Sequence, residues 1–165
     1  MDSMKILEID ELAKRIEKLK SQGKKIVLCH GCFDLMHPGH IKYFQASKKM
    51  GDVLVVTVSP DIYVDKGDGR PVFNQTLRAE SIAALECVDY VAINKWPTAV
   101  ETLRLLRPNI YVKGQEFENK EDKSQLKFNS DGSIQIPGQS LKFKKIKPKF
   151  EEIFEQDYGE DNSKY

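Results

Sequence analysis

The chain of 165 residues lacks any apolar run near the ~20 residues that a membrane-spanning helix requires, so no transmembrane segment is expected. Its first residues are acidic rather than basic, unlike a secretory signal or transit peptide, and we expect a cytoplasmic protein. A strong excess of one charge is also absent, because 26 Lys and Arg stand against 25 Asp and Glu. Such a balance disfavours a protein that coats nucleic acid, and neither nucleic acid nor a membrane is an expected partner.

Cysteine is scarce. The three residues are an odd number and too few for a disulfide scaffold, and Cys29 and Cys32 lie in or beside an apolar run that is typical of a strand. We therefore expect free thiols in a reducing compartment.

Apolar residues are scarce in the last third of the chain, where only 13 of residues 115–165 are hydrophobic. Its charges are also separated, with a lysine block over 142–149 followed by an acidic run over 151–161. Segregated charge of this kind is typical of solvated or disordered segments. We predict a domain over 1–117 and a divergent, polar, charge-segregated and partly disordered tail over 118–165.

The first 114 residues alternate between two hydrophobic periods. Short apolar runs predict buried strands at 26–29, 53–58, 90–93 and 110–112. Helical spacing before and between these runs predicts helices that begin near Asp10, Pro38, Leu77 and Thr98, the first ending at Gly23. In the third of these helices, the candidate core residues are Leu77, Ile82, Ala84 and Leu85.

Strands that alternate with helices predict right-handed crossovers, and so an α/β fold with a Rossmann-like parallel sheet and helices on both faces. Ligands of such sheets bind beyond the carboxyl ends of the strands. The segments after Cys29, Val58, Ile93 and Val112 are therefore the candidate site.

The segment from His30 to His40 follows the first strand and carries most of the chemistry. Gly31 permits a turn at the strand end, and Gly39 removes a side chain where a ligand approaches the helix start. His37 and His40 are three residues apart, so both imidazoles can lie on one side of the first turn. Backbone N–H groups and the positive dipole end favour an anion there, which indicates phosphoryl or nucleotidyl chemistry.

Three other interpretations compete for this segment. Cys29, Cys32, His37 and His40 spell C-x2-C-x4-H-x2-H, a possible zinc set, although Cys29 belongs to the strand and structural zinc sites use longer spacings between ligand pairs. A redox C-x-x-C pair needs a helix directly after its first thiol, and the helix here starts later. The two histidines can also simply cap the helix.

Residues 31–40, with the sequence GCFDLMHPGH, resemble the H-x-G-H signature of the nucleotidylyltransferase superfamily, in the form found in glycerol-3-phosphate cytidylyltransferases and the nucleotidyltransferase domain of ADP-heptose synthases. Further resembling blocks are GDVLVV at 51–56, KG at 66–67, GRPV at 69–72, Arg78, VDYV at 88–91 and RPNIYVKG at 107–114. The resemblance covers about residues 25–117. It implies the same α/β fold and an enzyme that transfers AMP or CMP from ATP or CTP to a phosphorylated sugar or polyol, releasing pyrophosphate.

The resemblance also implies roles for particular residues. The catalytic group would comprise His37, His40, Lys66 and Arg78. The nucleotide-binding group would comprise Gly31, Cys32, Phe33, Asp34, Gly39, Lys113, Gly114 and Glu116. From the residues alone, the interpretation of Lys66 and Arg78 as ordinary surface cations is favoured over a role in the site. For Asp34, a turn-forming or capping role and a ligand role have equal support.

Mg²⁺ is expected to accompany the triphosphate, held mainly by phosphates and water, with no metal site of the protein's own. The expected partners are the nucleoside triphosphate, the phosphorylated acceptor, a second copy in a homodimer, and a fused or separate sugar kinase.

One element of the superfamily pattern is missing from the sequence, a Ser/Thr-rich phosphate-binding turn that opens a final helix. The serines after Gly114 are isolated. Three explanations are open: the chain is part of a longer protein, its tail has diverged so that lysines substitute, or catalytic power is lost. The alternative function is therefore a catalytically weak nucleotide-binding module of a sugar-activation system. The base and the acceptor are not determined by the sequence.

Overall fold

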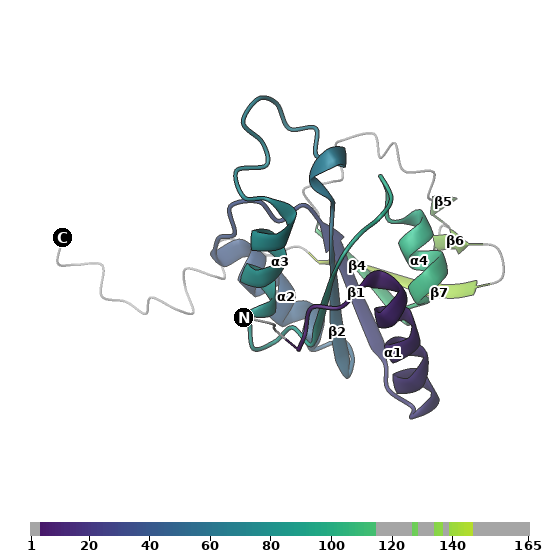
Figure 1. Ribbon diagram of the computed structural model, residues 1–165. Helices are drawn as coiled ribbons and strands as arrows, with labels where there is room; N and C mark the ends of the chain where they lie inside the picture. Colours follow the sequence, from purple (N-terminus) through teal and green to yellow (C-terminus); the bar gives the residue numbers. More distant parts are fainter. Residues whose placement is uncertain (1–3, 115–126, 129–133, 137–138, 147–165) are drawn as a thin grey trace, which may run out of the picture.

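The structure is a computed structural model that describes residues 4–114, 127–128, 134–136 and 139–146. Its helices are α1 (Ile9–Ser21), α2 (Pro38–Lys48), α3 (Gln75–Ala83) and α4 (Val100–Leu106), with a short 3-10 turn η1 (Asp61–Tyr63). Its strands are β1 (Ile26–Gly31), β2 (Val53–Val58), β3 (Tyr90–Ile93), β4 (Ile110–Gly114), β5 (Lys127–Phe128), β6 (Ile134–Ile136) and β7 (Gln139–Ile146). Strands and helices alternate along the chain as far as β4 (Figure 1).

The strands form one sheet in the order β3-β2-β1-β4-β7-β6-β5. The first four are mutually parallel, and β1 pairs with β2 over six residues, from Ile26 opposite Val53 to Gly31 opposite Val58. Every residue of β2 is buried, as expected of a strand covered on both faces. The predicted parallel sheet is confirmed.

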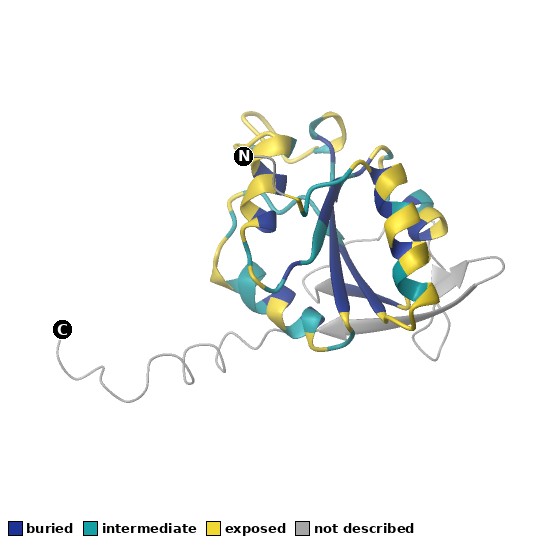
Figure 2. Ribbon diagram, turned by 60° about the horizontal axis from the view of Figure 1, so that its bottom comes forward, coloured by how far each residue is buried: buried dark blue, intermediate teal, exposed yellow. Residues whose placement is uncertain are grey.

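Helices cover both faces of this sheet (Figure 1). Leu12 and Ile16 of α1 and Leu103 of α4 share one core cluster with Leu28 of β1. On the other face, Phe44 of α2 and the apolar side of α3 join a second cluster. Figure 2 shows the buried strands between the two helical layers. The carboxyl ends of the parallel strands are thereby fixed in one rigid edge.

The helix boundaries agree with the predictions at the end of α1 and differ at the start of α3. Gly23 ends the first helix as predicted, with a left-handed φ of 79°. The third helix starts two residues early because Asn74 caps it, its side chain accepting the backbone N–H of Leu77 at 2.9 Å. Of the candidate core residues in this helix, Ile82 is buried as predicted, but the prediction is wrong for Leu77, which is 45% exposed, and for Ala84, which is also exposed. The adjacent Arg78 is buried instead. Arg78 is tolerated inside because the chain supplies acceptors for its donors, as described below.

The region predicted as a tail contributes strands to the sheet. β7 runs parallel to β4, with Lys144 opposite Val112 and Lys145 opposite Lys113. β6 then pairs antiparallel with β7. Residues 139–146 therefore extend the same sheet, and the carboxyl ends of β4 and β7 lie at the same edge.

At the opposite side of the sheet, the segment before α1 runs beside β3. Leu7 donates its backbone N–H to Val91 at 2.9 Å, and Val91 donates to Lys5 at 2.8 Å. An isolated parallel bridge joins Ile6 to Val91. Across the described residues, none of the helices combines the length and the apolar character needed to cross a membrane.

Candidate active site

The loop between β1 and α2 turns sharply at the carboxyl edge of the sheet. Phe33 and Leu35 both have a φ of 53°, in the left-handed region that non-glycine residues rarely adopt. The ring of Phe33 turns back over the chain: a Cβ on Gly31 would lie 2.9 Å from its tip, so a larger residue at position 31 would displace the ring. The same ring packs against Phe44 at 4.9 Å and edge-on to His40 at 5.8 Å between centroids. Phe33 thus helps to orient one of the two predicted catalytic imidazoles.

His37 and His40 form a reciprocal cap at the start of α2. Nδ1 of His37 accepts the backbone N–H of Gly39 at 3.1 Å, and Nδ1 of His40 accepts the backbone N–H of His37 at 3.3 Å. Pro38 occupies the first helical position, where a missing N–H is tolerated. The two rings lie 4.0 Å apart between centroids, with 31° between their planes. The structure therefore brings the two imidazoles together.

This cap determines which nitrogen of each ring carries the proton. A neutral imidazole whose Nδ1 accepts a hydrogen bond has its proton on Nε2. In the neutral form, each ring therefore carries its proton on Nε2, beside the positive end of a helix dipole, which is an arrangement suited to phosphate oxygens. The helix-capping interpretation and the anion-site interpretation are compatible, because the cap uses one nitrogen of each ring and the ligand would use the other.

Asp34 lies between the two left-handed residues, and its carboxylate is 2% exposed. It accepts the backbone N–H groups of Val72 at 2.7 Å and Phe73 at 3.0 Å, and the guanidinium of Arg70 at 3.1 Å. Burial alone would raise the pKa of Asp34, but the two backbone donors and Arg70 outweigh it, so this pKa lies below its usual value. The geometry favours the turn-forming role for Asp34 over direct contact with nucleotide.

Arg78 projects from α3 into the interior and is 1% exposed. Its Nη1 donates to the carbonyl of Cys32 at 2.6 Å, and its Nε donates to the carbonyl of Phe73 at 2.9 Å. Its Nη2 donates to the carbonyl of Ser59 at 2.9 Å and to the carboxylate of Asp61 at 2.6 Å. The surface-cation interpretation is therefore excluded, and the side chain joins the loops that follow β1 and β2.

The remaining predicted site residues are spread over two further loops. Lys66 is exposed in the long connection between η1 and α3. Lys113 and Gly114 end β4, in register with Lys145 and Ile146 of β7. Glu116 lies outside the described residues. The backbone therefore brings Lys113 and Gly114 to the same sheet edge as the histidines.

The zinc interpretation is not supported by the geometry. Cys29 is fully buried in β1, and burial raises the pKa of its thiol to about 11 against hydrogen bonds from Ser47 and Tyr43 that lower it. Metal-bound thiols must be deprotonated. Within the described ranges, no three His, Cys, Asp or Glu side chains gather as a metal site would require.

Sequence reasoning missed several polar contacts at this edge. His30 begins the predicted segment, but its contact was not predicted: its Nδ1 lies 2.8 Å from the hydroxyl oxygen of the buried Thr57 on the neighbouring strand. Asn94 after β3 is also buried. Its Oδ1 accepts a hydrogen bond from the Thr102 hydroxyl at 2.5 Å, and its Nδ2 donates to the carbonyl of Trp96 at 2.8 Å. The available signal was position alone, since each of His30, Thr57 and Asn94 lies at or just beyond a strand's carboxyl end.

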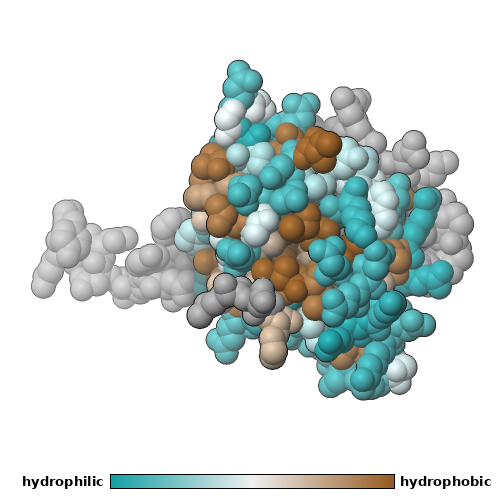
Figure 3. Space-filling model, viewed as in Figure 1, coloured by the Kyte–Doolittle hydropathy of each residue, from teal (hydrophilic) through white to brown (hydrophobic). Residues whose placement is uncertain are grey.

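Apolar side chains surround the loops of the site. Exposed large hydrophobic residues are concentrated in these loops and the first turn of α3, namely Leu35, Ile62, Tyr63, Val72, Phe73 and Leu77. The space-filling view shows apolar surface over this region and a hydrophilic surface over α1 (Figure 3). Grouped exposed apolar residues are typical of a binding surface.

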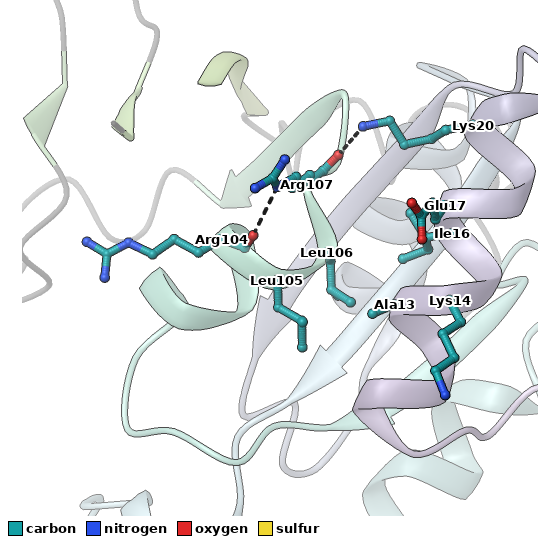
Figure 4. A pocket seen from close by; sticks show the side chains of 9 residues that line it. All are labelled: Ala13, Lys14, Ile16, Glu17, Lys20, Arg104, Leu105, Leu106 and Arg107. Atoms are coloured by element: carbon teal, nitrogen blue, oxygen red, sulfur yellow. Dashed lines mark hydrogen bonds between the residues drawn. The ribbon is translucent and has the colours of Figure 1, made fainter. Parts of the chain in front are cut away.

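A concavity lies between α1 and α4, away from the histidines (Figure 4). Lys20 spans it, donating from Nζ to the carbonyl of Arg107 at 2.7 Å. Its lining residues are Ala13, Lys14, Ile16, Glu17, Lys20, Arg104, Leu105, Leu106 and Arg107. Lys20 and Arg107 precede β1 and β4, so this end of the groove is at the amino edge of the sheet and away from the histidines.

A parallel sheet with helices on both faces, and an imidazole-capped helix start at its carboxyl edge, define an α/β protein of the nucleotidyltransferase type. The chain belongs to the cytidylyltransferase-like family, whose profile matches residues 28–151. The predicted resemblance is confirmed.

Individual relatives agree with this assignment. The bifunctional protein HldE of Aliarcobacter butzleri is 42% identical over 118 residues, 70% of this chain and 25% of that protein. The HldE of Geobacter metallireducens is 45% identical over 115 residues, 68% of this chain and 24% of that protein. The chain thus spans about a quarter of the length of these relatives.

Solved structures share the fold. A lipopolysaccharide core biosynthesis protein from Thermoplasma volcanium superposes with a TM-score of 0.61 at 30% identity, covering 75% of this chain and 97% of that one. A pantoate-beta-alanine ligase from Francisella tularensis superposes with a TM-score of 0.50 at 17% identity, covering 67% of this chain and 56% of that one. The second likeness concerns the fold alone.

Proposed function

We propose that this chain transfers a nucleoside monophosphate from ATP or CTP to a phosphorylated sugar or polyol and releases pyrophosphate. A phosphate oxygen of the acceptor attacks the α-phosphorus, and the bond from that phosphorus to the bridging oxygen of the β-phosphate breaks. The observation that carries this proposal is the pair of imidazoles, 4.0 Å apart, at the start of α2 and the carboxyl edge of the sheet. Membership of the cytidylyltransferase-like family supports it.

The chain contributes position and charge rather than a nucleophile. The Nε2–H groups of His37 and His40 would donate to the triphosphate oxygens, where negative charge grows as pyrophosphate leaves. Backbone from Gly31 to Phe33 would hold the nucleotide beside them. The exposed Lys66 would neutralise phosphate from the neighbouring loop. Holding both reactants in line supplies the remaining rate enhancement.

Mg²⁺ would arrive with the triphosphate and be held by phosphate oxygens and water, supplying charge neutralisation when bound. Two carboxylates near the turn after β1 already have partners: Asp34 is engaged by Val72, Phe73 and Arg70, and Asp61 pairs with Arg78. No step of the proposal is therefore assigned to a protein-bound metal.

A sugar phosphate is the acceptor that the relatives favour. The structure with 97% of its length covered is that of a lipopolysaccharide core biosynthesis protein, and the curated relatives are bifunctional. We propose a sugar 1-phosphate acceptor, supplied by a kinase that is fused or separate. A homodimer stays a prediction.

The test is pyrophosphate release from ATP and from CTP with a panel of sugar 1-phosphates. We expect turnover with one base, and a loss of roughly 10²-fold or more in kcat for His37→Ala and His40→Ala. Gln45→Ala, an exposed change on the same helix, is the control that should match wild type. The transfer proposal is lost if wild type turns over no acceptor or if the histidine variants match it.

A nucleotide-binding module without catalysis is the second candidate, favoured by the absence from the sequence of a Ser/Thr-rich phosphate-binding turn after Gly114. Calorimetry with each nucleotide separates the two candidates. Binding without pyrophosphate release would favour the module.

A further inference from the structure

The turn after β1 is held in a conformation that its sequence does not favour. Phe33 and Leu35 both have a φ of 53°. Non-glycine residues in this region cost free energy and persist only where surrounding contacts hold them. The residues that supply those contacts alternate with the strained ones: Cys32 precedes Phe33, and Asp34 separates it from Leu35.

The first anchor is the guanidinium of Arg78, whose five N–H donors are all used within the chain. Nε donates to Phe73, Nη1 donates to the carbonyl and lies 3.7 Å from the Sγ of Cys32, and Nη2 donates to Ser59 and Asp61. No donor is left for a ligand. One buried side chain therefore joins the strained turn to both ends of the segment 59–73.

The second anchor is the carboxylate of Asp34, which is almost completely buried. Its Oδ2 accepts from Val72 and Arg70, and its Oδ1 accepts from Phe73. The contacts run in the opposite direction to those of Arg78: here the turn after β1 supplies the side chain, and the segment 59–73 supplies the donors. Asp34 of the turn therefore holds the segment 59–73, and Arg78, which follows that segment, holds the turn.

We propose that Arg78 and Asp34 are positioning residues that together hold the strained turn and the segment carrying Lys66 as one unit, without either side chain touching the nucleotide. The inference rests on the proposed function, because it explains how Lys66 and the backbone near Phe33 come to face one ligand. A cation on a surface loop is otherwise free to sample many positions. Two buried anchors at the same turn restrict that freedom.

Conservative substitutions test the anchors. Arg78→Lys keeps a positive charge but has three donors on a flexible stem, so it cannot reach all the acceptors of the two loops at once. Asp34→Asn keeps the shape but replaces one accepting oxygen by an NH₂ group, which cannot accept from Val72 or Phe73. Asp61→Asn removes the negative charge that pairs with Arg78, at a partly exposed position. It is the variant to use if Arg78→Lys does not fold.

The first measurement is amide hydrogen exchange of residues 32–35 and 59–73 in the full chain without nucleotide. We expect faster exchange in both segments for each variant, with exchange in β2 and α2 unchanged. The second is the dissociation constant for ATP or CTP by calorimetry, with an expected rise of about tenfold or more, since the loops that would contact the nucleotide lose their preorganisation. Arg104→Lys and Glu80→Gln, both exposed and outside the two segments, are the matched controls.

The results separate this inference from the proposed function. Amide hydrogen exchange and nucleotide affinity can be measured without turnover, so they test the roles of Arg78 and Asp34 even if wild type releases no pyrophosphate. Folded variants with wild-type exchange in both segments would overturn the inference. Unchanged exchange with lost affinity would instead assign Arg78 a direct contact, and would overturn it equally.

Discussion

The Nδ1 atoms of His37 and His40 each accept a backbone N–H from the same helical turn, at 3.1 Å from Gly39 and 3.3 Å from His37. Two side chains proposed for catalysis are therefore also the cap of α2. This dual use makes their structural and chemical contributions separable by substitution.

Asparagine at position 37 should separate the two contributions. His37→Asn retains an accepting oxygen that suits a helix cap, so its free energy of unfolding should stay close to wild type, whereas His37→Ala should lose about 1 kcal/mol. Both should lose turnover, because neither has an imidazole. Urea unfolding and pyrophosphate release are the measurements. Retained turnover in His37→Asn would contradict the proposed role of the ring.

Asp34 should make the fold sensitive to acid. Its pKa is lower in the folded chain than its usual value, so its carboxylate stabilises the fold at pH values above about 3.9. That stabilisation should be lost as the pH falls through the folded-state pKa. Thermal unfolding between pH 3 and 7 should therefore depend less steeply on pH below about 4 in Asp34→Asn than in wild type. Equal slopes would show that Asp34 is not anchored as described.

The three cysteines should differ in reactivity. Cys29 is buried with its pKa raised to about 11, whereas Cys32 and Cys87 are partly exposed. A thiol reagent at pH 8 should modify Cys32 and Cys87 in the native chain, and Cys29 only after unfolding. Because Cys32 adjoins the proposed nucleotide site, ATP or CTP should slow its modification and leave Cys87 unaffected, as followed by mass spectrometry. Equal protection of both would indicate a general tightening of the fold.

The lysines of β7 should contribute to triphosphate binding. β7 brings Lys144 and Lys145 into register with Val112 and Lys113, at the edge where the nucleotide would bind. Replacing both by Ala should weaken triphosphate binding by more than it weakens binding of the nucleoside alone, since the loss is of phosphate charge. Lys14→Ala with Lys18→Ala on α1 is the matched control. An unchanged affinity for the triphosphate would contradict a role of these lysines in its binding.

The parallel core could be predicted because its signals are local. Continuous apolar runs rich in β-branched residues, such as 53–58, are stable as strands that are buried on both faces. The H-x-G-H segment contains the residue that caps the helix it begins, so the start of α2 is also a local signal. The burial of Arg78 and exposure of Leu77 could not be predicted, because the reason lies in acceptors from Cys32 and Ser59, distant in sequence. The pairing of β7 with β4 is likewise non-local and runs against the tail's polar composition.

The short stretch beside β3 has a consequence for solubility. Without Lys5, Ile6 and Leu7, the outer row of N–H and C=O groups on β3 would be open, and an open strand edge is a template for pairing with another chain. The residues before α1 thus act as a built-in guard against aggregation, independent of any chemistry at the other edge. A chain trimmed to begin at Glu8 would keep every proposed catalytic group and yet be expected to self-associate through β3.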